Sequence, residues 1–261
     1  MLLEKKFDEG VICWVDLGST DLKRTKEFYC KLFNWSAHDF NVPGAGTYTT
    51  FKYEGKNVAA AYEIVSQQAQ GKAFPFWMSY VAVDNVEASV KKAEALGGVI
   101  VLSPTDVDNR GKMAVVKDPT GAVFALWEAK SFAGIELCHV PCSLAWNELY
   151  TTDTSKANDF YTKLFNWEVD TVPMPVGVYT NFKIKGNYVC GMLQINEYMG
   201  PIPSNWAVYF QVKNCDETAK SVVELGGKIL IPPTDLPNGG RIATVQDPAG
   251  VIFSIQHGIH E

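Results

Sequence analysis

The chain repeats itself after about 130 residues, and this internal repeat constrains the fold more than any other feature of the sequence. Residues 14–35 align without a gap on residues 146–167, half of the aligned positions are identical, and both segments end in Phe-Tyr-x-Lys-Leu-Phe-Asn-Trp. The match resumes at Asp118-Pro-Thr-Gly121, which corresponds to Asp247-Pro-Ala-Gly250. A chain of 261 residues is long enough for two domains. We therefore predict a first domain at 1–130, a linker at 131–141 and a second domain at 142–261.

Each half of the chain shows the same order of elements twice. Residues 11–17 predict a strand, and apolar residues then recur at helical spacing from Leu22 to Phe33, behind an N-cap at Thr20 or Asp21. Further strands are predicted at about 36–41, 47–53 and 57–65. The order restarts with a strand at 76–84, a helix at 86–96 and strands at about 99–103, 111–117 and 122–128. The predicted fold class is α+β, with four βαβββ modules.

The two repeated motifs have structural explanations. Phe28, Tyr29, Leu32 and Phe33 form an apolar stripe that would pack the helix on the sheet. The Asp-Pro-x-Gly segments are typical of tight turns, because Pro presets φ and Gly allows a positive φ. Neither motif is a catalytic triad.

A chain with four βαβββ modules, this first-helix motif and Asp-Pro-x-Gly before the last strand resembles the vicinal oxygen chelate superfamily. That superfamily includes glyoxalase I, extradiol dioxygenases, and fosfomycin- and bleomycin-resistance proteins. The resemblance covers nearly the whole chain and is closest to two-domain, glyoxalase-like bacterial proteins. It implies two tandem glyoxalase-like domains, in which paired modules form a cupped mixed sheet around a cavity. A shared fold does not by itself establish a shared reaction.

The resemblance also implies where a metal would be held. Metalloenzymes of the superfamily carry His, Gln or Glu at the start of the first strand of a module and in the middle of its last strand. The corresponding residues here are Trp14, Ala59, Met78, Ala125, Trp146, Cys190, Ala207 and Ser254. An indole offers only an N–H donor, so it cannot ligate a metal. We therefore expect no cofactor and no metal at these positions, with a divalent metal ion at displaced ligands such as Asp16 or Glu148 as the alternative.

Strand alternation predicts which side chains share the concave face of each sheet. Asp16 and Glu148 lie two residues beyond Trp14 and Trp146, so each acid should face the same side as its tryptophan. The same rule adds aromatic and polar residues from neighbouring strands. The candidate ligand-binding residues are Trp14, Tyr48, Tyr80, Trp127, Trp146, Tyr179, Tyr209 and Gln256, and the candidate catalytic residues are Asp16 and Glu148.

Charge and hydropathy limit the partners. The chain has 23 Lys and Arg against 29 Asp and Glu, a net charge of −6, so it has no strong basic field to attract nucleic acid. No stretch approaches the ~20 apolar residues of a membrane helix, and the first residues lack the apolar run of a signal peptide. We expect a cytoplasmic protein with no membrane partner. Four covalently linked modules favour a monomer with internal pseudo-twofold symmetry, and a homodimer is the alternative.

Three functional hypotheses follow from these residues. The first is a protein of the glyoxalase and bleomycin-resistance type that binds a small aromatic or apolar metabolite in aromatic-lined cups. The second is a lyase or dioxygenase that uses a relocated metal, or Glu148 as a general base. The third is an interaction protein whose cups are closed cores. The first is favoured, because residues that cannot bind a metal occupy the metal positions.

Overall fold

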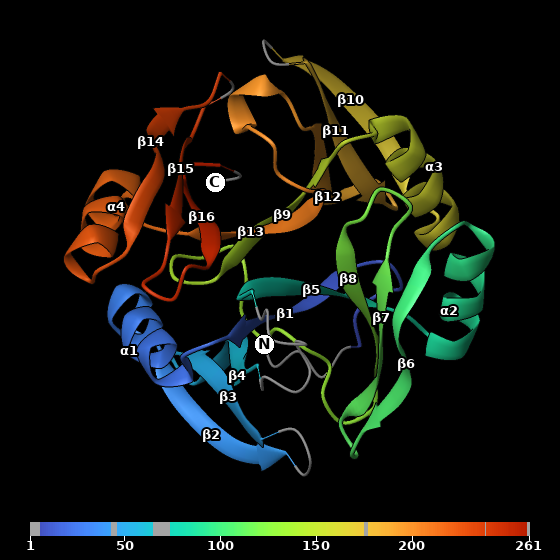
Figure 1. Ribbon diagram of the computed structural model, residues 1–261, viewed down its shortest axis with the longest axis horizontal. Coiled ribbons are helices and arrows are strands. Elements are labelled where there is room, and N and C mark those ends of the chain that lie inside the picture. Colours follow the sequence, from blue (N-terminus) through green and yellow to red (C-terminus); the bar gives the residue numbers. More distant parts are fainter. Residues whose placement is uncertain (1–5, 43–45, 65–73, 175–176, 238, 260–261) are drawn as a thin grey trace. The chain divides into compact units, whose positions relative to one another are not determined.

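The computed structural model describes residues 6–42, 46–64, 74–174, 177–237 and 239–259, and it contains the four βαβββ modules that the sequence predicts (Figure 1). The elements of the first half are β1 (Ile12–Ser19), α1 (Leu22–Phe33), β2 (Ser36–Val42), β3 (Gly46–Tyr53), β4 (Lys56–Glu63), β5 (Phe76–Ala82), α2 (Val86–Ala95), β6 (Val99–Val107), β7 (Gly111–Lys117) and β8 (Val123–Ala129). The elements of the second half are β9 (Leu144–Thr151), α3 (Thr154–Phe165), β10 (Glu168–Met174), β11 (Gly177–Ile184), β12 (Asn187–Gln194), η1 (Glu197–Met199), β13 (Asn205–Gln211), α4 (Cys215–Glu224), β14 (Lys228–Asp235), β15 (Arg241–Gln246) and β16 (Ile252–His257).

The repeated helix motif contains its own start and stop signals. Asp21 caps α1 by accepting a hydrogen bond from the Arg24 backbone N–H at 3.0 Å, and Asp153 caps α3 in the same way. Both helices end at an asparagine in the left-handed conformation, Asn34 with φ 55° and Asn166 with φ 56°. The repeated Asp and Asn therefore fix where these helices begin and end.

Each half of the sequence forms one mixed eight-stranded sheet. The strand orders are β2-β3-β4-β1-β5-β8-β7-β6 and β10-β11-β12-β9-β13-β16-β15-β14. β1 pairs with β4, and β5 with β8, in parallel, whereas the hairpin-connected strands pair antiparallel. The predicted α+β class with mixed sheets is confirmed.

Among the described strands of the first half, β6 differs most from its predicted bounds. β6 was expected to end at 103 but continues through Pro104 to Val107, because it is an edge strand and its pairing with β7 shifts register between Leu102 and Thr105. β4 ends at Glu63, and the predicted end of that strand at residue 65 lies outside the described residues.

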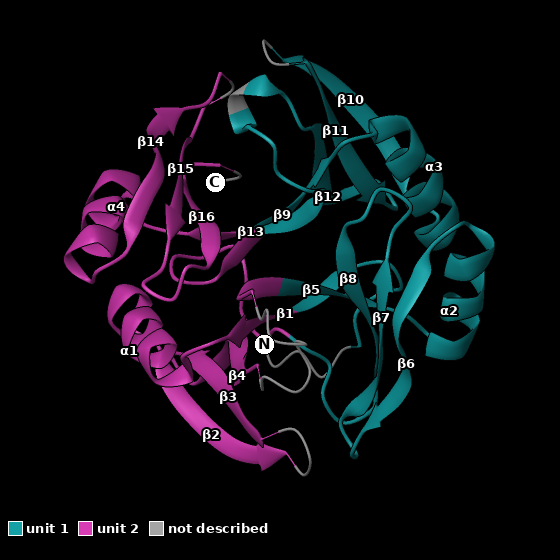
Figure 2. Cartoon of the chain, in the orientation of Figure 1, with its two compact units in different colours: residues 1–14, 78–134, 146–207 teal, residues 15–77, 135–145, 208–261 magenta. Residues whose placement is uncertain are grey.

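Packing divides the chain into two compact units that do not follow the two sequence halves (Figure 2). Unit 1 contains residues 1–14, 78–134 and 146–207, and unit 2 contains residues 15–77, 135–145 and 208–261. Unit 1 thus combines the second and third modules, and unit 2 combines the first and fourth.

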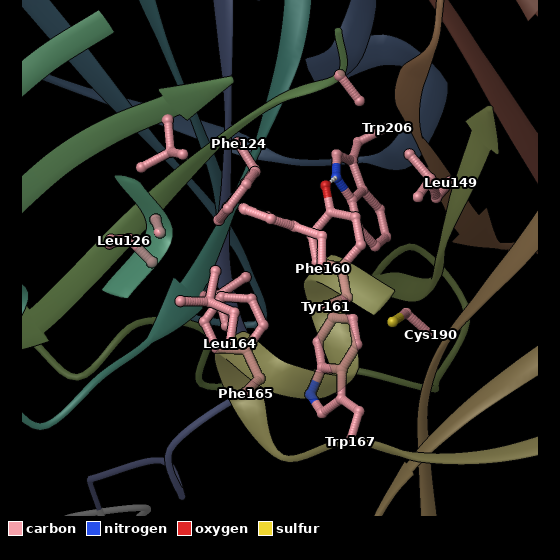
Figure 3. Packing of buried hydrophobic residues seen from close by; sticks show 14 of the residues in the cluster. Phe124, Leu126, Leu149, Phe160, Tyr161, Leu164, Phe165, Trp167, Cys190 and Trp206 are labelled. Carbon is pink, nitrogen blue, oxygen red and sulfur yellow. Dashed lines mark hydrogen bonds between the residues drawn. The ribbon is translucent and has the colours of Figure 1, made fainter. Parts of the chain in front are cut away.

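The core of unit 1 packs Tyr161 of the repeated helix motif against Trp206 (Figure 3). Tyr161 on α3 donates a hydrogen bond to Asp118 Oδ2 at 2.9 Å and accepts one from the Trp206 indole N–H at 2.9 Å. The other oxygen of Asp118 accepts from the backbone of its own turn, where Gly121 has φ 107°. Burial and the charge of Asp118 raise the pKa of Tyr161. The helix motif of the third module is therefore bonded to the turn motif of the second.

Unit 2 brings the corresponding residues of the first and fourth modules near one another, but Asp247 Oδ2 has no hydrogen-bond partner among the described residues. Trp77 donates from its indole to the Tyr29 hydroxyl at 3.3 Å. Burial raises the pKa of Tyr29, and the charge of Asp247 adds to the increase. Asp247 accepts hydrogen bonds from the backbone N–H groups of Ala249 and Val251. Burial nevertheless raises the pKa of Asp247, against these hydrogen bonds.

Within the described residues, no helix is long and apolar enough to cross a membrane.

Candidate functional site

The Asp16 cluster lies in unit 2 and consists of Asp16, Tyr48 and Tyr62. Asp16 on β1 is 1% exposed, and the Tyr48 hydroxyl donates to its Oδ2 at 3.1 Å. Tyr48 pairs across strands with Tyr62, and the two rings stack at 6.4 Å between centroids. Burial and then the charge of Asp16 raise the pKa of Tyr62. Asp16 and Tyr48, which the sequence analysis named separately, are therefore in contact, and Tyr62 is a member that the sequence analysis missed.

The Glu148 cluster lies in unit 1 and consists of Trp146, Glu148 and Tyr179. The Tyr179 hydroxyl donates to Glu148 Oε2 at 2.7 Å and accepts a hydrogen bond from the Trp146 indole N–H at 2.9 Å. Glu148 is 7% exposed. All three residues were predicted from strand alternation and the repeat.

Gly191 makes the Glu148 cluster possible. It lies on β12 directly opposite Glu148 on β9. A Cβ atom at Gly191 would overlap the Tyr179 hydroxyl, and it would lie 2.6 Å from Tyr179 Cζ and 3.0 Å from Trp146 Nε1. The position therefore requires glycine for the close approach of side chains to the strand.

The aromatic cluster lies in unit 1 and consists of Trp14, Tyr80, Trp127 and Phe132. Tyr80 and Trp127 meet at 6.4 Å between ring centroids, and Phe132 packs edge-on against Trp14 at 4.9 Å. The Trp127 indole donates to the Phe132 carbonyl at 3.0 Å. The strand neighbours Val81 and Leu126 belong to the helix-covered core, so alternation places Tyr80 and Trp127 on the opposite face of their strands.

The remaining predicted residues, Tyr209 and Gln256, lie in unit 2 on a more polar face. Tyr209 on β13 pairs with Ser254 on β16, and Gln211 pairs with Gln256. The Gln256 side-chain amide donates to Gln211 Oε1 at 3.2 Å, and the hydroxyls of Thr244 and Ser254 lie 3.1 Å apart. Gln211 and Thr244 were missed because their equivalents in the first half, Ala82 and Val115, are apolar. Cross-strand register brings them beside the predicted residues.

The residues at the superfamily's metal positions do not fit a divalent ion. They supply indole, thioether, methyl and hydroxyl groups, and burial raises the pKa of Cys190, which opposes formation of the thiolate that a metal would need. In the part of the chain that the structure describes, no group of three or more His, Cys, Asp or Glu residues could hold a metal. The acids of the two clusters are instead hydrogen-bonded by tyrosines.

Comparison with protein families gives a match to both halves of the chain. The family described as the Glyoxalase/Bleomycin resistance protein/Dioxygenase superfamily matches residues 12–126 and again 143–255. The tandem duplication predicted from the repeat is thereby confirmed.

Two bacterial relatives are similar along nearly their whole length. The "Anthracycline biosynthesis protein DnrV" of Streptomyces peucetius is 36% identical over 265 residues, covering 96% of this chain and 94% of that protein. The "Putative glyoxylase CFP32" of Mycobacterium tuberculosis is 34% identical over 255 residues, covering 96% and 95%.

Solved structures show the same fold at low sequence identity. The Mn(II)-bound glyoxalase from Novosphingobium aromaticivorans has a TM-score of 0.66 at 16% identity, over 95% of this chain and 82% of that one. The 2,3-dioxygenase LapB from Pseudomonas sp. KL28 has a TM-score of 0.67 at 13% identity, over 96% and 93%. The family match in both halves shows that the chain belongs to the Glyoxalase/Bleomycin resistance protein/Dioxygenase superfamily.

Proposed function

We propose that the protein binds a small aromatic or apolar metabolite and that it has lost the metal site of its superfamily. The observation that carries the proposal is the aromatic cluster, which stands on the strand face opposite the helices and includes Trp14 at a superfamily metal position. Edge-on and offset contacts between aromatic rings stabilise a bound planar ligand beyond the burial of area. The loss of the metal site is supported by the side chains at the metal positions, which are unsuitable as metal ligands.

One of the relatives supports an aromatic ligand. DnrV is named for anthracycline biosynthesis, and an anthracycline contains a planar hydroxyanthraquinone. At 36% identity along the whole chain, this relative makes a planar, hydroxylated polycycle the class of ligand to test first.

The test uses 1,4-dihydroxyanthraquinone as the probe and tryptophan fluorescence as the signal. We expect the probe to quench the fluorescence on binding, and a Trp127→Phe variant to lose part of the quenching, because Trp127 is in the aromatic cluster. Tyr80→Leu should weaken binding about fivefold or more, since it removes a ring contact. The matched control is Tyr188→Leu, because Tyr188 is 48% exposed on β12 and outside the cluster.

Two results would contradict the proposal. In the first, the tryptophan fluorescence changes when the protein unfolds but does not change when this probe or naphthalene is added. A closed core would give that result. The other is equal affinity of the Tyr80→Leu and Tyr188→Leu variants. Metal analysis of protein purified without a histidine tag tests the second part, for which we expect less than about a tenth of an equivalent of divalent metal.

A second candidate function is proton transfer by Glu148. The 2.7 Å hydrogen bond from Tyr179 and the second bond from Trp146 to Tyr179 hold the carboxylate in one orientation. A fixed orientation lets one carboxylate oxygen point at the proton to be removed, as a general base requires. If a ligand with an acidic C–H group is found, its exchange with deuterium should fall at least a hundredfold in Glu148→Gln, with folding retained. Equal exchange rates would exclude this candidate.

A further inference from the structure

The last module differs in chemistry from the second module at corresponding positions. We call Gln211, Thr244, Ser254 and Gln256 the amide–hydroxyl row. The corresponding residues of the second module are Ala82, Val115, Ala125 and Trp127. The strand pairing is the same in both modules, because Tyr80 pairs with Ala125 and Tyr209 pairs with Ser254. One template therefore carries an apolar face in unit 1 and a polar face in unit 2.

The row faces away from the helices of unit 2. Phe210 on β13 and Phe253 on β16 pack against each other, and Phe253 also contacts Phe28 on α1. Because side chains alternate along a strand, Gln211 and Gln256 lie on the other face. This is the face on which the superfamily resemblance predicts ligand-binding residues.

The two glutamines keep unused hydrogen-bonding groups although they are buried. Gln211 is 5% exposed and Gln256 is 3% exposed. Gln256 donates its amide to Gln211 Oε1, and among the described residues neither side chain makes another hydrogen bond. The pair therefore leaves one amide N–H₂ and one carbonyl oxygen. Exchanging the oxygen and nitrogen of both amides leaves the same two groups, so this result does not depend on their assignment.

We propose that the amide–hydroxyl row is a second recognition site, for an uncharged ligand group that presents a hydrogen-bond acceptor beside a donor. A carboxamide or lactam edge has this pattern, and it would use the free donor of one glutamine and the free acceptor of the other. Neither the remaining amide N–H₂ nor the remaining carbonyl oxygen of the pair is among the fully buried atoms that lack a partner, so both are accessible to a ligand group that the chain itself does not supply. A charged group fits poorly, because the row contains only neutral side chains. This site shares no residue with the aromatic cluster.

The experiment titrates ¹⁵N-labelled protein with three small cyclic probes and follows the glutamine side-chain signals by NMR. 2-Piperidone presents both groups, N-methyl-2-piperidone lacks the donor, and cyclohexanone offers the acceptor alone. We expect 2-piperidone to shift the side-chain signals of Gln211 and Gln256 and to bind at least tenfold more tightly than the other two probes. Similar affinity for all three probes would overturn the proposal.

Variants locate the binding. Gln256→Met keeps the length of the side chain and removes its amide, so 2-piperidone should bind at least tenfold more weakly. Gln246→Met is the matched control, because Gln246 on β15 already donates to the Gly250 carbonyl and is outside the row. If Gln256→Met does not fold, Gln211→Met replaces it, and the probe comparison on the unmodified protein stands by itself. Unchanged affinity in a folded variant of the row would also overturn the proposal, whatever the aromatic probes show.

Discussion

The Asp16 and Glu148 clusters are built on the same template, yet their hydrogen bonds differ. In both, an acid on the first strand of its module accepts a hydrogen bond from a tyrosine on the third strand of the same module. The distance is 3.1 Å to Asp16 and 2.7 Å to Glu148. The residue opposite the acid is Ala60 in the first cluster and Gly191 in the second. The residue opposite the tyrosine is Tyr62 in the first and Leu193 in the second.

This difference shows how one Cβ atom changes a site. Where Gly191 leaves space, the Tyr179 hydroxyl lies against the strand and receives the Trp146 indole N–H. Where Ala60 fills that space, Tyr48 instead stacks on Tyr62. The Glu148 cluster is thus a hydrogen-bonded chain, and the Asp16 cluster is an acid beside two stacked phenols.

Exchanging the two small residues should have the largest effect on this comparison. Gly191→Ala should cost about 2 to 3 kcal/mol of unfolding free energy, because the new Cβ atom displaces Tyr179 from a packed site. The control Ala60→Gly should cost only about 1 kcal/mol, through the greater freedom of the unfolded chain. Denaturant unfolding measures both values. A Gly191→Ala variant as stable as the unmodified protein would show that Tyr179 is free to move.

Removing the phenol hydroxyls should have the next largest effect. Tyr179→Phe should cost about 2 kcal/mol, since it removes the donor to Glu148 and the acceptor for Trp146. Tyr48→Phe should cost about 1 kcal/mol, because its hydrogen bond to Asp16 is longer. Denaturant unfolding measures both losses of unfolding free energy. Equal losses in the two variants would contradict the distinction between the two clusters.

The smallest effect concerns titration of Tyr62. Its pKa is raised in the folded protein, so the unfolded chain releases this proton first, at a pH of about 10. The stability contributed by Tyr62 is therefore present below that pH and is lost as the pH rises through the folded pKa. Asp16→Asn should lower the Tyr62 pKa but leave it above the ordinary value, because burial is the larger cause. The difference in tyrosinate absorbance between variants with and without Tyr62→Phe measures this shift, and no change would mean that the charge of Asp16 does not reach Tyr62.

The sequence predicts the elements and the acids better than their neighbours. Strand alternation predicts that Asp16 shares a face with Trp14 and Glu148 with Trp146, because it depends on spacing along one strand. The repeat identifies Tyr48 and Tyr179 as candidates, but their hydrogen bonds to the acids come from the way the strands pair. Tyr62 and Gly191 could not be found in this way, since their roles depend on register between strands. The link between Tyr161 and Asp118 was also missed, because each motif has a sufficient local explanation as a helix stripe or a turn.

The bond between Tyr161 and Asp118 has a consequence for the origin of the chain. Its donor belongs to the second half of the sequence and its acceptor to the first. In unit 2 the order is reversed, because Tyr29 belongs to the first half and the nearby Asp247 to the second. A half chain cut at the linker would bury a tyrosine and an aspartate whose partners are both on the other piece. Two copies of one ancestral half could satisfy both residues by exchanging them, with Tyr29 of each copy beside Asp118 of the other. Gene duplication and fusion would then have turned an association that depends on concentration into one that occurs within a single molecule.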